Sequence, residues 1–425
     1  MRFRPAAMAS LMILTTGLAL SGCESATADD PMDLDALPRL NAVEEMRIGS
    51  VDDPDFGFSR ITTMDVDREG RIYVLELVDR EIRVYSPDGA SLLHRIGGPG
   101  EGPGEFMGSP RHGVVGDTLW TYDSRNGRIT LFDREGTLLS TGQTLGVRVP
   151  LWNSYGYVMP VDMLPGGLFI SSLTRIASSR DDPELTTPPT DTIPVPRVLF
   201  DATGAVIDTI GWDPSPPPRM ARPPAMSGGG IAIVELSSGR YIVPGPPTEL
   251  DVWIALADGR IILDMRTPTT PDDAVFTITR LDLDRDTVYR RDLHYRPQRY
   301  ASAQLDSIAI REARDGPAGS AGAAGLDEAD IAAAARAIRG KMTFPELQPA
   351  IRSWHTGEDE ALWLLRTGED GPSRWLVLDP GGIPRGELQL PSAVRPVWSS
   401  GDTFWTVEPD ELDVPWLVRY RLVEG

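Results

Sequence analysis

Histidines are the side chains of this sequence best suited to acid–base chemistry or to metal binding. There are four, His94, His112, His294 and His355, and no two have the spacing of a zinc-binding pair. We expect His112 and His355 to lie on strands that line a central channel, and the other two on strands at an outer rim. His112 and His355 are therefore our histidine candidates for ligand binding. The alternative is that both are structural histidines held by neighbouring groups.

Carboxylates form the second chemical set. Asp65 and Asp162 lie near the ends of strands that we also expect to face the channel. An inward-facing acid–Asn–acid set would suit a Ca²⁺-dependent hydrolase or lactonase, but no convincing Asn accompanies these two residues. We therefore predict no catalytic residue, no metal ligand and no cofactor, and keep Ca²⁺ as the open alternative.

Nucleophile and nucleotide motifs give no support for other enzyme classes. The sequence has no Gly-x-Ser-x-Gly elbow, and its only cysteine is Cys23. The glycine-rich run Gly97–Phe106 lacks the Gly-Lys-Ser/Thr ending of a phosphate loop. We interpret that run as a crossover between sheets, with Phe106 packed in the core.

Aromatic residues in connecting segments supply the remaining candidates. Trp152, Tyr155 and Trp212 fall at predicted loop or loop-entry positions, where large rings can line a pocket. We include them with His112 and His355 as predicted ligand-binding residues. Tryptophans on predicted strands are instead expected to pack between sheets.

A repeat indicates the elements that position these side chains. Ile82–Gly89 recurs 47 positions later as Ile129–Gly136, each copy preceded by another short strand pattern. The strands are rich in β-branched and aromatic residues and are bounded by Gly, Asp and Pro. A period of this length, filled with short strands and tight turns, is typical of β-propeller blades.

Later segments keep the same order of strands and turns, although their sequences are less regular. A strand, a Gly/Asp turn and a second strand recur near residues 199–211, 281–294 and 376–390. The last unit ends after Trp416–Leu422 without a fourth strand, whereas Ala42–Ile48 is a strand without a unit. Pairing the two would close a ring and cover two exposed edges. We predict an all-β fold, a six-bladed β-propeller closed by an N-terminal strand.

Loop lengths distinguish the two faces of this ring. Tight turns fall on one face, and the long connections, the loop-rich face, fall on the other. The long connections are Gly97–Pro110, Leu173–Pro196, Trp212–Thr248, Arg266–Pro271 and Tyr295–Pro349. The largest, residues 295–349, is predicted to be a helical insertion between blades four and five, with Ser302 capping its first helix. Because binding residues concentrate on loops held by a rigid scaffold, we place the function on the loop-rich face.

The N-terminal residues are predicted to be an export signal. Arg2 and Arg4 precede the apolar stretch Ala6–Leu20, which is short for a membrane span. Leu20-Ser21-Gly22-Cys23 resembles a bacterial lipoprotein lipobox, which implies cleavage before Cys23 and lipidation of its thiol. An ordinary signal peptide is the alternative. We divide the chain into a signal peptide (1–22), a flexible tether (23–39) and a propeller (40–425).

Gly97–Phe106, together with Asp123, Asn126, Arg128 and Ile129 in the second copy, resembles the NHL repeat. The remaining units resemble the divergent six-bladed propellers of bacterial exported lipoproteins. This resemblance implies a propeller scaffold and no particular reaction, because such rings serve as binding platforms and as enzymes.

Charge narrows the choice of partners. The formal net charge is −21, which repels phosphate backbones and argues against nucleic acid. We predict a lipid-anchored protein of the bacterial cell envelope, periplasmic or outer-membrane-associated, that contacts the membrane through its lipid only. Its predicted role is a binding module for a protein, peptide or glycan ligand. The alternatives are a Ca²⁺-dependent hydrolase or lactonase in the channel and a purely structural scaffold.

Overall fold

The computed structural model describes residues 32–144, 147–149, 154–175, 194–214, 231–236, 239–244, 251–256, 258–264, 268, 274–315, 328–341, 346–367, 371–392 and 394–425. The predicted signal peptide, the lipidation site Cys23 and the candidate Trp152 lie outside these residues.

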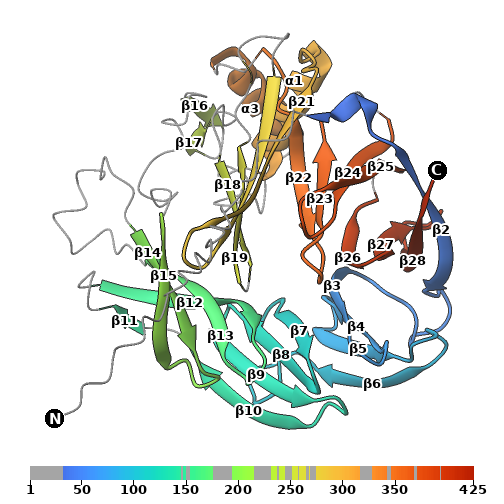
Figure 1. Ribbon diagram of the computed structural model, residues 1–425, viewed down its shortest axis with the longest axis vertical. Helices are drawn as coiled ribbons and strands as arrows, with labels where there is room; N and C mark the ends of the chain where they lie inside the picture. The colour runs from blue at the N-terminus through green and yellow to red at the C-terminus, as the bar shows by residue number, and fades with distance from the viewer. Residues whose placement is uncertain are drawn as a thin grey trace, which may run out of the picture.

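The first two predicted units are present as separate four-stranded antiparallel sheets (Figure 1). One contains β3 (Ile61–Val66), β4 (Ile72–Glu76), β5 (Glu81–Tyr85) and β6 (Leu92–Gly97). The other contains β7 (Arg111–Val115), β8 (Thr118–Asp123), β9 (Arg128–Asp133) and β10 (Leu138–Gln143). Their bounds match the predicted strands within one or two residues, because alternation and turn signals are strongest here.

The middle of the chain forms two five-stranded sheets and a hairpin. One sheet contains β11 (Val147–Val149), β12 (Ser154–Met163), β13 (Phe169–Arg175), β14 (Pro194–Phe200) and β15 (Val206–Pro214). The other contains β18 (Asp251–Leu256), β19 (Gly259–Asp264), β20 (Ala274–Asp282), β21 (Thr287–Tyr295) and the short β1 (Met32–Asp33). The hairpin is β16 (Ile231–Leu236) with β17 (Gly239–Pro244).

The C-terminal part departs from the prediction of separate sheets, because it forms one sheet of eight strands. The order is β22 (Ile351–Thr356), β23 (Leu362–Arg366), β24 (Ser373–Leu378), β25 (Pro384–Leu390), β2 (Arg39–Ile48), β28 (Pro415–Glu424), β27 (Thr403–Pro409) and β26 (Pro396–Ser400). The start of β2 pairs in parallel with β25, and the whole of β2 pairs antiparallel with β28. One N-terminal strand therefore joins two four-stranded groups.

The predicted closure between the two ends of the chain is confirmed. Ala42 lies opposite Leu422, and Ile48 lies opposite Leu417. Upstream of β2, β1 runs parallel to β21, and a 3-10 turn (η1, Leu34–Ala36) places Leu34, 1% exposed, in the core beside that sheet. Part of the segment predicted as a flexible tether is thus paired and buried, because Leu34 has an apolar site to fill.

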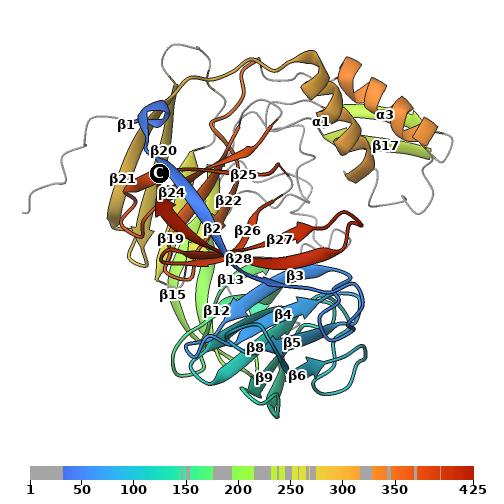
Figure 2. The ribbon, with the colours of Figure 1, turned by 90° about the vertical axis from the view of Figure 1, so that its right-hand side faces the viewer.

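The first strands of successive groups contact one another in sequence. β22 contacts β26, β26 contacts β3, β3 contacts β7, β7 contacts β12, and β12 contacts β18. Apolar clusters fill the spaces between neighbouring sheets, as where Ile48, Met64 and Trp405 meet. Antiparallel four-stranded groups arranged side by side around inner strands define a β-propeller (Figures 1 and 2).

Aspartates close many of the tight turns. In the turn between β9 and β10, Asp133 Oδ1 accepts the backbone N–H groups of Glu135 at 3.0 Å and Thr137 at 2.7 Å. Asp201, Asp282 and Asp379 accept the N–H four residues on in the corresponding turns of later sheets. A short side-chain acceptor thus satisfies backbone donors that the strand ladders leave free.

The predicted helical insertion is also present, as α1 (Ser302–Asp315) and α3 (Glu328–Lys341) (Figure 2). The predicted cap is displaced by one residue. Ala301 is the N-cap residue before α1, and Gln304 Oε1 accepts the Ala301 N–H at 3.0 Å, because a glutamine at this position can reach back over the first turn. Neither helix, nor any other in the described residues, is long and apolar enough to cross a membrane.

Candidate functional site

Asp65 is the most constrained carboxylate of the inner strands. Its Oδ2 accepts the Val114 N–H from β7 at 2.6 Å, and its Oδ1 accepts the Val66 N–H at 2.7 Å and the Trp398 Nε1–H from β26 at 3.1 Å. Burial raises the pKa of Asp65 to about 6 against the opposing effect of these hydrogen bonds, and the charge of Asp162 adds to the rise. One side chain therefore joins three groups of strands.

Two further acids interact with Asp65 electrostatically. Asp162, on β12, binds the next backbone N–H, Met163, at 2.7 Å as Asp65 binds Val66, and burial raises its pKa. Glu358 follows β22, in the turn before β23. Loss of solvent around its carboxyl raises its pKa to about 8, and the charges of Asp65 and Asp162 add to the rise, although the residue as a whole is exposed. Three carboxyls from three groups of strands thus share one region at the turn end of the inner strands.

The two predicted histidines both occupy inner strands. His112, on β7, has Nδ1 at 3.0 Å from Thr63 Oγ1 of β3. His355, on β22, has Nε2 at 3.1 Å from Ser399 Oγ of β26. Burial lowers the pKa of each imidazole to about 4, so both rings are neutral near pH 7. Each ring bonds a hydroxyl of a neighbouring group, so both serve at least as contacts between groups.

Two of the three predicted aromatic candidates, Tyr155 and Trp212, lie within strands rather than at the predicted loop or loop-entry positions. Tyr155 lies in β12, opposite Arg148, and Trp212 lies in β15, opposite Pro196. Both strands extend beyond their predicted ends, because pairing with a neighbouring strand continues past the point where the alternating pattern stops. Their side chains, like Trp152, lie outside the described residues.

The described residues do not provide a complete set of metal ligands. Among the described residues, no group of three or more His, Cys, Asp or Glu side chains could hold a metal ion. The open alternative of a Ca²⁺ site therefore gains no ligands from the described inner strands. What Asp65 and Glu358 can do without a metal is hold and exchange protons near neutral pH.

Arginines gather at the opposite, loop-rich end, and the sequence reasoning missed them. Arg352 is an exposed residue near the start of β22. Burial of its guanidinium lowers its pKa, and the charges of Arg395 and of Arg311 on α1 lower it further. Trp354, two residues on, is 40% exposed. The register of β22 shifts between Ile351 and Ser353, so the Arg-x-Trp spacing alone does not place these two side chains on one face.

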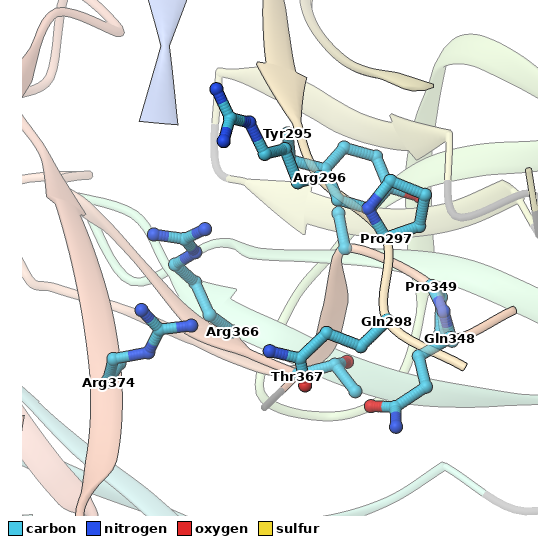
Figure 3. A pocket seen from close by; sticks show the side chains of 10 residues that line it. Tyr295, Arg296, Pro297, Gln298, Gln348, Pro349, Arg366, Thr367 and Arg374 are labelled. Atoms are coloured by element: carbon cyan, nitrogen blue, oxygen red, sulfur yellow. The ribbon is translucent and has the colours of Figure 1, made fainter. Parts of the chain in front are cut away.

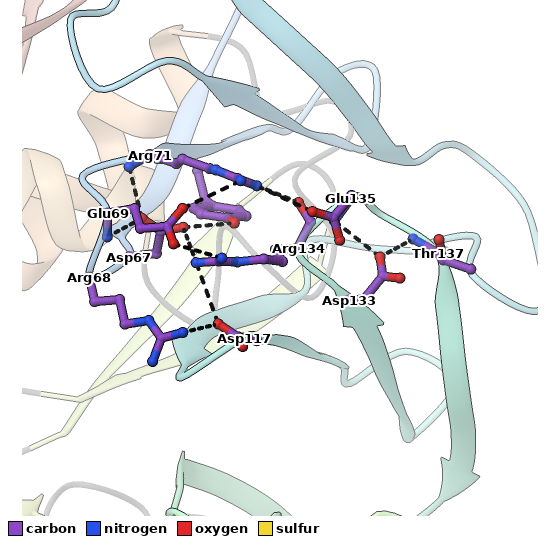
Figure 4. A network of polar contacts seen from close by, with 10 residues as sticks. Asp67, Arg68, Glu69, Arg71, Asp117, Asp133, Arg134, Glu135 and Thr137 are labelled. Carbon is purple, nitrogen blue, oxygen red and sulfur yellow. Dashed lines mark hydrogen bonds and ion pairs between the residues drawn. The ribbon is translucent and has the colours of Figure 1, made fainter.

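Ion pairs join the first two sheets at the turn end. Arg134 bridges to Glu69 at 2.7 Å and to Asp117 at 3.4 Å, and Arg68 binds Asp117 at 2.6 Å (Figure 4). These contacts join the first two sheets across their tight turns. The turn end there is neutralised by its own side chains.

No protein-family model matches the chain, and no curated protein matches its sequence. Solved structures that resemble it include a putative exported protein from Bacteroides fragilis, with 11% identity, a TM-score of 0.43 and coverage of 91% of this chain and 96% of that one. Streptogramin B lyase shares 10% identity over 90% and 98% of the two chains, with a TM-score of 0.39. Regucalcin from Agrobacterium tumefaciens, a calcium-binding protein, shares 10% over 90% and 96%, with a TM-score of 0.34. None of these similarities assigns an activity.

Proposed function

We propose that this chain is a six-bladed β-propeller, exported and anchored through lipidated Cys23, that binds a protein, peptide or glycan ligand with its loop-rich face. The order of contacts between first strands supports six blades, with the eight-stranded sheet counted as two blades bridged by β2. The lipobox resemblance supports the anchor. The proposed division of the chain is the one predicted from the sequence, with a signal peptide at residues 1–22 and a propeller at residues 40–425.

The exposed surface around Arg352 and Trp354 at the loop-rich end carries the proposal. At the turn end, aspartates close the turns and the arginines of the first two sheets are paired with acids. At the loop-rich end, Arg352 lies near two other arginines, Trp354 is exposed, and two helices project beside the ring. Exposed aromatic and arginine side chains are enriched where proteins bind partners.

The base of the insertion allows a clean test. The Gln348 N–H donates to the Gln298 carbonyl at 2.8 Å, and the Tyr300 N–H donates to the Glu346 carbonyl at 3.2 Å. These bonds form a short antiparallel ladder, which a two-residue Asn-Gly turn can close in place of residues 301–345. The variant keeps every strand of the propeller and removes α1 and α3.

Wild type and this variant would be compared on arrays of envelope peptides and glycans. We expect the variant to lose the wild type's specific binding while keeping its thermal transition. Arg68→Gln, a change at the turn end, is the matched control and should bind like wild type. Retained binding in the insertion variant, or equal loss in the control, would reject the loop-rich face.

A channel enzyme is the second candidate, favoured by the convergence of Asp65, Asp162 and Glu358. Groups whose surroundings move their pKa values toward neutrality are suited to general acid–base catalysis. A panel of lactones and esters, assayed with and without Ca²⁺, tests it. Turnover that Glu358→Gln abolishes would support a hydrolase, and absence of turnover in the wild type would remove this candidate.

A further inference from the structure

A cavity of about 280 Å³ lies at the loop-rich end, at the base of the helical insertion. It is formed by the chain leaving β21, the chain entering β22, the end of β23 and the start of β24. Its lining includes Arg296, Gln298, Gln348, Arg366 and Arg374. Pockets for small ligands start at about 300 Å³, so this one suits a compact group.

Three guanidinium groups lie on the same side of this cavity (Figure 3). Arg366 is buried and fixed, because it donates to Glu387 Oε2 at 2.7 Å and to the Leu34 carbonyl at 3.3 Å. Arg374 shares the same Glu387, at 3.8 Å from Oε1. Arg296 is exposed and forms no ion pair with any described residue.

The charge balance of the cavity is therefore opposite to that of the chain. In a protein of net charge −21, three arginines line this one cavity, and the carboxylate of Glu387 pairs with Arg366 and Arg374 among the described residues. The neighbouring Arg352, with Arg311 and Arg395 close to it, adds to the positive potential at this end. Planar guanidinium groups bind carboxylate and phosphate oxygens in pairs, and Gln298 lines the cavity with them, whereas the Gln348 amide already donates to the Arg299 carbonyl and to Gln304 Oε1.

We propose that this cavity binds the oxyanion of a small organic ligand, a carboxylate or a phosphate. Arg366 is the fixed member, held by Glu387, and Arg296 and Arg374 supply the charge that the ligand neutralises. The proposal rests on the proposed function, since it names the ligand chemistry of the loop-rich face. A ligand carrying this group on a sugar or a peptide end fits both the volume and the charge.

Isothermal titration of the purified full-length protein tests the proposal with three probes: glucuronate, glucose 6-phosphate and glucose. We expect one or both anions to bind, and affinity to fall with added salt because the contact is ionic. Binding of glucuronate alone identifies a carboxylate site, and binding of glucose 6-phosphate alone identifies a phosphate site. No binding of either anion at millimolar concentration, or equal binding of glucose, would overturn it.

Variants separate this cavity from general charge effects. Arg296→Gln and Arg374→Gln should each weaken anion binding about tenfold, the loss expected for one charge-assisted contact. Arg290→Gln, on the outer strand β21 with 63% exposure, removes the same charge away from the cavity and should leave binding unchanged. Unaltered binding in the first two variants, or equal loss in the third, would overturn the proposal.

The experiment distinguishes this proposal from the broader one. The lining residues 295–298 and 348–350 lie outside the segment replaced in the insertion variant, 301–345. Failure of both anions with loss of array binding in the insertion variant rejects the oxyanion site and keeps the loop-rich face. Anion binding with unaltered array binding in that variant keeps the oxyanion site and rejects a contribution of α1 and α3 to binding.

Discussion

Glu76 and Asp123 lie 47 positions apart, each at the end of the second strand of its sheet, and use their carboxylates in the same way. Glu76 accepts the backbone N–H groups of Ser59, Arg60 and Val78 at 2.9–3.1 Å. Asp123 accepts those of Met107, Gly108 and Arg125 at 2.6–3.0 Å. Each carboxylate ties the connection entering its sheet to the turn that leaves the second strand.

Glu76→Gln should therefore destabilise the protein although it is nearly isosteric. The amide NH₂ would face backbone donors, and a buried donor left without an acceptor costs about 1–3 kcal/mol. Urea unfolding monitored by tryptophan fluorescence measures the loss. Glu101→Gln, an exposed change in the crossover before β7, is the control and should stay within about 0.5 kcal/mol of wild type.

The sequence repeat predicted this pair's strands but not the bonds it makes. Alternation, turn residues and the 47-residue period locate β4 and β8, because those signals are local. Which backbone groups a buried acid accepts depends on the path of the preceding crossover, which has no periodic pattern. For the same reason the extension of β12 and β15 through Tyr155 and Trp212 was missed.

The candidate site was predictable only in part. His112 and His355 were placed on inner strands from local pattern, and that placement is confirmed. Glu358 was not foreseen as a partner of Asp65, because 293 positions of chain separate them and their approach depends on how the strand groups surround the channel. The arginine cavity likewise draws on four separated segments.

The seam between the N-terminal and C-terminal strands should carry a large share of the stability of the ring. Ile48 is 2% exposed, opposite Leu417, and packs with Met64 and Trp405. Ile48→Ala leaves a cavity and should cost about 2–5 kcal/mol.

Val43→Ala is the matched control, because Val43 lies on the same strand with 44% of its surface exposed. It should change stability by less than about 0.5 kcal/mol. Chemical denaturation of the two variants compares them directly. Equal losses of unfolding free energy in the two variants would show that burial of Ile48 at the seam does not contribute more to stability than an exposed position on the same strand.

Alanine substitutions at two glycines distinguish the cost of a strained backbone from the cost of a steric clash. Gly136 and Gly116 both have positive φ, +86° and +63°. A Cβ on Gly136 would lie 2.9 Å from Ile96 Cγ1, whereas a Cβ on Gly116 would meet nothing within 4 Å. Gly116→Ala should cost about 1–2 kcal/mol for the left-handed backbone, and Gly136→Ala about 1–3 kcal/mol more for overpacking. Unfolding midpoints that coincide would contradict the assigned contact.

The two histidines and Glu358 should make stability depend on pH in opposite directions, in windows that overlap. The pKa values of His112 and His355, lowered to about 4 by burial, lie below the ordinary 6.5, so the unfolded chain binds protons that the folded protein does not. Stability from the neutral rings is present above about pH 6.5 and is lost as pH falls toward 4. The pKa of Glu358 is raised instead, from 4.5 to about 8. The folded protein therefore keeps a proton that the unfolded chain releases, and stability falls as pH rises through that window.

Glu358→Gln isolates the second effect, because glutamine cannot ionise. The variant should be more stable than wild type at pH 9, and this advantage should shrink toward pH 4.5, where the carboxyl of the unfolded wild-type chain also begins to regain its proton. Thermal unfolding across pH 4.5–9 measures the difference, with Glu101→Gln as an exposed carboxyl control. Because the Glu358 side chain retains contact with solvent, we predict the sign of the change and its pH window. A difference between wild type and variant that stays constant with pH would show that Glu358 does not share the charged environment of Asp65 and Asp162.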